Sequence, residues 1–69
     1  MQEDKLADFV RKNRLGAKLT QPELAQKAGV GLRFIREMEQ GKATLRMDAV
    51  NKVLRLFGKG LGPVDLPRE

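Results

Sequence analysis

The sequence has 69 residues, enough for one domain with a small core, and no cysteine or histidine with which a disulfide or zinc site could stabilise that core. It also lacks serine, tyrosine and tryptophan, and no imidazole is present to activate Thr20 or Thr44, so we expect no enzyme, no metal site and no cofactor. The net charge is +5, and residues 11–59 alone carry twelve basic and four acidic side chains, which favours nucleic acid or another anionic partner.

The first segment predicts one amphipathic helix. Within residues 2–15 the apolar side chains recur at helical spacing and leave a polar outer face, as in a helix that covers a core. Gly16 is expected to end this helix, and residues 17–19 form the connection to the next one.

A two-turn helix is predicted next, over residues 20–29. Thr20 has the position of an N-cap, and Glu23 follows three residues later, as in a capping box. Pro22 fits the first turn, because its missing N–H has no helical partner there. Gly29 supplies the left-handed residue that stops the helix. A helix this short needs tertiary packing to be stable.

Two further helices complete the pattern. Residues 31–40 place three apolar side chains on one side and charged ones on the other, and Gly41 closes this third helix. A longer apolar series predicts a fourth helix from Met47 up to Gly58, capped by Thr44 or the polar backbone near it.

The expected fold is all-α, a compact four-helix bundle over residues 1–58 followed by a tail over residues 59–69. The tail is rich in glycine and proline, and its one sign of order is the alternation in residues 64–66. It is therefore either a frayed end or a short edge strand that pairs with another chain. The expected core consists of Leu6, Phe9, Val10, Leu19, Leu24, Ala28, Val30, Ile35, Met38, Leu45, Met47, Val50 and Leu54, with Phe34 as a further candidate.

Two short helices joined by a tight glycine turn, in a basic chain, describe a helix-turn-helix, whose second helix fits the major groove of DNA. Residues 19–42, LTQPELAQKAGVGLRFIREMEQGK, resemble this motif in the Cro and cI type phage repressors, the XRE family. The four-helix pattern extends the resemblance to Phe57. It implies a lambda-repressor-like fold and the function of a transcriptional repressor. Such a repressor binds double-stranded, pseudo-palindromic operator DNA whose half-sites lie about one helical turn apart.

Within that family, residues 10–42 and 44–58 are most similar to HipB-type antitoxins. That resemblance implies a homodimer that represses its own operon and holds a HipA-like kinase toxin, in the bacterial cytoplasm and on the nucleoid. Two alternatives stay open: a stand-alone XRE regulator without a toxin, and a protein-interaction adaptor that has lost operator binding. No membrane partner is expected, because no apolar run could span a bilayer and no helix has both a broad apolar and a strongly basic face.

The resemblance also implies DNA-binding roles for particular residues. Gln21 would contact the DNA backbone and the edge of the half-site, and the groove-facing side of the third helix would consist of Gly31, Leu32, Arg33 and Arg36. Arg33 and Arg36 are the expected base readers, because a guanidinium can donate two parallel hydrogen bonds to guanine. For each arginine the alternative is a phosphate contact or a solvated position. Leu32 either presses on a thymine methyl group or packs against the protein.

Two loop lysines and one ion pair complete the residues that the resemblance singles out. Lys18 and Lys42 lie in loops that meet phosphates in this family, with a solvated position as the alternative. Arg14 and Glu39 match an internal salt bridge of the family, so Arg14 is expected to be structural. Dimer contacts are expected at the apolar residues least easily placed in a small core, namely Phe57, Leu61, Val64 and Leu66.

Overall fold

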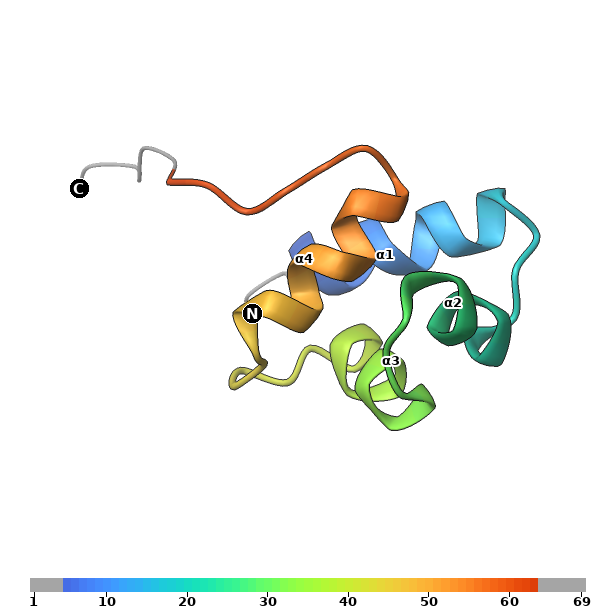
Figure 1. Ribbon diagram of the computed structural model, residues 1–69, viewed down its shortest axis with the longest axis horizontal. Helices are drawn as coiled ribbons and strands as arrows, with labels where there is room; N and C mark the ends of the chain where they lie inside the picture. The colour runs from blue at the N-terminus through green and yellow to red at the C-terminus, as the bar shows by residue number, and fades with distance from the viewer. Residues whose placement is uncertain (1–4, 64–69) are drawn as a thin grey trace.

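The computed structural model describes residues 5–63, and this part of the chain contains four α-helices and no strand. The helices are α1 (Lys5–Gly16), α2 (Gln21–Ala28), α3 (Leu32–Glu39) and α4 (Met47–Leu56), arranged as a bundle with the segment after α4 leading away from it (Figure 1). The predicted all-α, four-helix fold is confirmed. Residues 64–66, for which a strand is one alternative, lie outside the described residues.

The core lies between the helices, and every helix contributes to it. Its buried side chains are Val10 from α1, Leu24 and Ala25 from α2, Ile35 and Met38 from α3, and Val50, Val53 and Leu54 from α4. α2 packs against both α3 and α4, and α1 packs against α3. Because α2 and α3 have only eight residues each, this packing rather than intrinsic propensity stabilises them.

Met47, Val53 and Phe57 differ from the expected arrangement. Met47, predicted in the core, is the first residue of α4 and is 68% exposed, because the first turn of that helix faces solvent. Val53, absent from the predicted core, is fully buried one turn after Val50. Phe57, expected at a dimer contact, is half-buried, and its ring packs edge-on against Phe9 with the ring centroids 6.2 Å apart.

The turn after α1 places a lysine in an unusual backbone conformation. The helix ends at Gly16, as predicted, but the residue with positive φ is Lys18, at 58°. The Lys18 N–H donates to the Leu15 carbonyl at 3.0 Å, and the Leu19 N–H donates to the Arg14 carbonyl at 3.0 Å. Positive φ is uncommon for residues other than glycine, so this loop has a backbone cost.

Both predicted ends of α2 are present. The Glu23 N–H donates to Thr20 Oγ1 at 3.2 Å and the Thr20 N–H donates to Glu23 Oε1 at 2.8 Å, which together form the capping box. At the other end Gly29 has a φ of 76°, and its N–H donates to the Ala25 carbonyl at 3.0 Å. The tight turn that follows determines where α3 begins.

The predicted side-chain cap of α4 at Thr44 is wrong. The N-cap residue is Arg46, and no side chain makes a cap hydrogen bond there. Instead, Arg46 donates from Nη2 to Asp48 Oδ2 at 2.7 Å, and this hydrogen bond lowers the pKa of Asp48. Asp48 lies in the first turn of α4, where a negative charge interacts favourably with the helix dipole. This interaction stabilises the start of the helix in the absence of a side-chain cap.

The capping box of α2 leads to a pH-dependent prediction. The hydrogen bonds with the Thr20 N–H and then the Thr20 hydroxyl hold the pKa of Glu23 below its ordinary value. A group with a lowered pKa stabilises the fold above its unfolded-state pKa, and this stabilisation is lost as the pH falls through the folded-state value. We therefore expect Glu23→Gln to have a lower Tm than the natural protein at neutral pH and the same Tm in acid, in melts followed by circular dichroism. A difference that stays constant across this range would contradict the assignment.

Candidate nucleic-acid interface

α3 presents a basic face to solvent. The side chain of Arg33 is 91% exposed, and Arg36, one turn further on, is also exposed. Gly31, the N-cap of α3, is exposed as well, with no atom within 4 Å of the position that a Cβ would occupy. Leu32 is half-buried and packs against the core, which supports the packing alternative for this residue.

A single carboxylate lies between two of the predicted DNA-binding cations. Glu37 Oε2 is 3.5 Å from Arg33 Nε and 3.2 Å from Lys42 Nζ. Ion pairs between exposed groups contribute little to stability, so both cations can exchange this carboxylate for another anion. The sequence analysis missed Glu37, although its position four residues after Arg33 indicates a neighbour on the same helix face.

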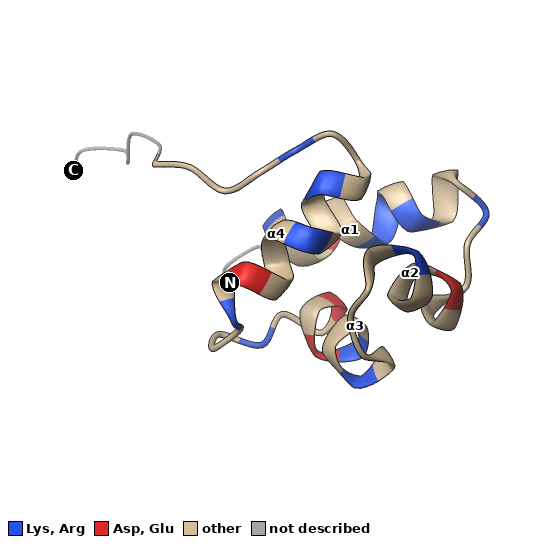
Figure 2. Cartoon of the chain, in the orientation of Figure 1, with Lys and Arg blue, Asp and Glu red and all other residues tan. Residues whose placement is uncertain are grey.

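An open groove lies beside α3, between the end of α1 and the start of α2. Three of the predicted DNA-binding residues, Lys18, Gln21 and Arg36, line it together with Arg11, which the sequence analysis did not select. Figure 2 shows basic segments on the loop after α1 and on α3. In the described part of the chain, Arg11, Lys18 and Arg36 have no acidic side chain within ion-pair distance, so their charges face the groove unneutralised.

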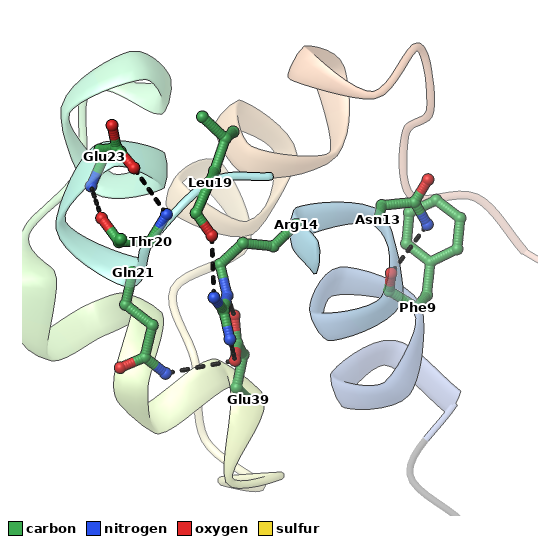
Figure 3. Close-up of polar contacts among 8 residues, drawn as sticks. All are labelled: Phe9, Asn13, Arg14, Leu19, Thr20, Gln21, Glu23 and Glu39. Carbon is green, nitrogen blue, oxygen red and sulfur yellow. Dashed lines mark hydrogen bonds and ion pairs between the residues drawn. The ribbon is translucent and has the colours of Figure 1, made fainter. Parts of the chain in front are cut away.

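An ion pair at the base of this groove joins α1 to α3. Arg14 donates from Nε to Glu39 Oε2 at 2.7 Å, from Nη2 to Glu39 Oε1 at 3.0 Å, and from Nη1 to the Leu19 carbonyl at 2.9 Å (Figure 3). Gln21 donates to the same carboxylate at 3.2 Å. The side chains of Arg14 and Glu39 are only 12% and 6% exposed. The hydrogen bonds that Arg14 donates to Glu39 raise the pKa of Arg14, although partial burial acts in the opposite direction.

This network fixes the orientation of the Gln21 side chain. Its amide nitrogen donates to Glu39, so the side chain extends from the first residue of α2 toward the ion pair of Arg14 and Glu39 (Figure 3). The positive end of the helix dipole favours an anion at the start of α2. The arrangement combines a helix start, a groove with basic side chains and an exposed helix with two arginines, which together suit a negatively charged, elongated ligand.

Leu61, one of the expected dimer contacts, lies on another surface. Leu61 is exposed, and its N–H donates to Asn51 Oδ1 at 3.0 Å, which attaches the segment after α4 to that helix. Leu61 lines a shallow apolar groove with Leu6, Leu45 and Met47. Val64 and Leu66, the other expected dimer contacts, lie outside the described residues.

Comparison with known proteins agrees with this geometry. Residues 10–64 match the helix-turn-helix family, and the chain therefore belongs to the XRE type of that family, a class of DNA-binding domains. It is similar to a protein of Sinorhizobium fredii (strain NBRC 101917 / NGR234) described as the uncharacterized HTH-type transcriptional regulator y4mF. The two are 47% identical over 53 residues, which span 77% of this chain and 66% of that relative.

Within residues 5–63 no helix is long and apolar enough to cross a membrane. The same residues contain no group of three or more acidic side chains able to hold a metal ion.

Proposed function

We propose that this protein is a sequence-specific transcriptional regulator that represses its target by placing α3 in the major groove of operator DNA. The observation that carries the proposal is the exposure of Arg33 and Arg36 on α3, directly beside a groove with unneutralised cations. The major groove is wide enough for one helix, and the neighbouring groove then faces a phosphate backbone. Family membership supports the same function.

The exposed residues divide into two roles in this proposal. Arg33 and Arg36 read base edges, because they extend from α3 itself. Gln21 and the loop residues Lys18 and Lys42 contact phosphates, which fixes the register of the protein on the duplex. The open space at Gly31 lets the start of α3 approach the DNA closely.

A homodimer is part of the proposal, because two copies related by a two-fold axis match a pseudo-palindromic operator. The apolar groove of Leu6, Leu45, Met47 and Leu61 supports one contact surface, since Met47 and Leu61 expose large apolar side chains next to each other. Lys42, from the loop after α3, lines the same groove, so this surface borders the proposed DNA-binding face. Val64 and Leu66 extend it in the proposal.

Replacing both exposed apolar residues should weaken that dimer. We expect Met47→Ser combined with Leu61→Ser to shift the mass in sedimentation equilibrium from dimer toward monomer without loss of helix content, because neither side chain belongs to the core. Leu15→Ser is the matched control, since Leu15 is equally exposed apolar surface near the other groove. An unchanged mass in the double variant, or an equal shift in the control, would refute this surface.

The finer proposal is that the regulator is also the antitoxin of a HipA-like kinase and controls its own operon. Its support is the resemblance of residues 10–42 and 44–58 to HipB-type antitoxins. The alternative is a stand-alone XRE regulator, which shares every DNA-binding feature and lacks the kinase. In either case we place the protein on nucleoid DNA in the bacterial cytoplasm.

One capture experiment tests these alternatives. The tagged protein is isolated from its own cells, the bound DNA is sequenced and the bound proteins are identified by mass spectrometry. Its own promoter together with a HipA-like kinase supports the antitoxin, and promoter DNA without a kinase supports the stand-alone regulator. A protein partner without enriched DNA would contradict the proposed function and favour an adaptor.

A further inference from the structure

A second basic surface lies between the C-terminal parts of α2 and α4, and we call it the α2/α4 patch. Lys27, Lys52 and Arg55 surround a shallow depression that Ala28 and Leu56 also line. Leu56, the last residue of α4, is 42% exposed and gives the depression a large apolar side chain. The patch therefore combines three cations with one aliphatic contact.

The cations of the α2/α4 patch lack acidic partners in the structure. No acidic residue lines the depression. Within residues 5–63, the ion pairs use other basic residues, and Lys27 only lowers the pKa of Glu23 at a distance, as the weakest of several contributions. Three cations without an ion-pair partner in the described residues surround one depression, and they create a positive potential that an acidic ligand would relieve.

The patch is separate from the proposed DNA-binding face. Lys27 is in the last turn of α2, whereas Gln21 begins that helix. The residues that line the patch and those that line the groove beside α3 do not overlap. Figure 2 shows the basic segments of α4 on the upper side of the molecule and those of α3 at its lower edge. A duplex held by α3 thus leaves the α2/α4 patch uncovered.

The mixed chemistry of the patch favours a protein segment over a second nucleic acid. A phosphate backbone satisfies cations but offers nothing apolar to Leu56. A segment in which acidic residues flank an aliphatic side chain satisfies both parts of the surface. We propose that the α2/α4 patch binds an acidic, leucine-containing segment of a partner protein while α3 holds DNA. This adds a second site to the proposed regulator and is independent of whether the partner is a toxin.

The test is a pair of titrations followed through the backbone amide signals of the ¹⁵N-labelled protein. The first probe is a short synthetic peptide in which aspartate and glutamate flank a single leucine, and the second is a double-stranded DNA fragment. The peptide should shift the amides of residues 27–28 and 52–56, and the DNA should shift those of α3 and the start of α2. A peptide with serine in place of leucine should bind several times more weakly.

A second experiment reverses the charge of two residues of the patch. Lys52→Glu combined with Arg55→Glu should weaken peptide binding about tenfold or more, because it places like charges against the peptide. The matched control is Lys5→Glu with Lys12→Glu, an equal change in net charge at exposed sites on α1, outside the patch. The control should alter peptide binding by less than about twofold. The two charge-reversed double variants should affect DNA binding to a similar extent, since neither changes a residue of α3.

Several outcomes would overturn the proposal. Peptide shifts concentrated on α3, or equal loss of peptide binding in the two charge-reversed variants, would mean that the peptide responds only to net positive charge. DNA shifts on the patch at the same concentrations as on α3 would make the patch a nucleic-acid site. If the proposed function is wrong, the DNA does not shift the amide signals of α3, whereas the peptide still shifts those of the α2/α4 patch. Circular dichroism of each variant excludes loss of the fold as the cause.

Discussion

Glu39→Ala is expected to remove much of the stability of the domain. The substitution leaves the Arg14 guanidinium, 12% exposed, with only the Leu19 carbonyl as a partner. Breaking a fully buried ion pair from one side costs about 3–5 kcal/mol, and this range is the upper bound for the part-buried pair of Arg14 and Glu39. The whole unfolding free energy of a 69-residue domain is about 3–10 kcal/mol. Urea and thermal unfolding, at one fixed protein concentration, should therefore show a variant that is largely unfolded or melts far below the natural protein.

Two comparison variants show whether the unpaired charge is the cause. Glu37→Ala removes a carboxylate from the same helix, but one that pairs with the exposed Arg33, and it should change stability by less than about 1 kcal/mol. Arg14→Met combined with Glu39→Leu removes both charges and should recover most of the stability, since apolar replacement of a whole buried pair is often neutral. If Glu39→Ala is no more harmful than Glu37→Ala, the pair is not structural.

Arg33→Ala and Arg36→Ala should each relax the choice of base at one position of the operator. An arginine that donates two hydrogen bonds to guanine discriminates against other bases by about 1–3 kcal/mol, which corresponds to roughly 5–150-fold in affinity. The operator is first selected from a random DNA library with the natural protein. The selection is then repeated with each variant, and the base preference is compared position by position.

Further variants distinguish base reading from phosphate contact. Arg33→Lys keeps the charge but not the planar pair of donors, so it should lose discrimination nearly as much as alanine does. Lys18→Ala should weaken binding uniformly across sequences and reduce the dependence of affinity on salt, as expected when one phosphate contact is lost. If the arginine variants behave like Lys18→Ala, with equal loss on all sequences, both arginines contact phosphates and the assignment is wrong.

The helices could be predicted because their ends are marked by residues with local physical meaning. The capping box of Thr20 with Glu23 and the left-handed Gly29 depend only on residues close together in the sequence, so a single sequence suffices to place α2. The start of α4 lacks such a marker: of the two alternatives, Thr44 or the polar backbone near it, Thr44 is wrong, because the helix begins after Arg46 without a side-chain cap.

The candidate site was less predictable, since it depends on distances between segments. Spacing along α3 indicates which side chains share a face, but not that Glu37 lies between Arg33 and Lys42. Arg11 was missed because only the packing of α1 against α3 brings it beside the groove. Met47 has the apolar character of a core residue, and only its position at the helix start explains its exposure.

The backbone at Lys18 has a consequence for any redesign of this protein. A left-handed residue with a side chain costs about 1 kcal/mol or more relative to glycine, so this position trades thermal robustness for a positive charge on the proposed phosphate surface. An optimisation guided by folding energy alone would replace Lys18 with glycine or asparagine early. The resulting variant is expected to have a higher Tm and a lower affinity for DNA. Stability and DNA affinity therefore favour different residues at position 18.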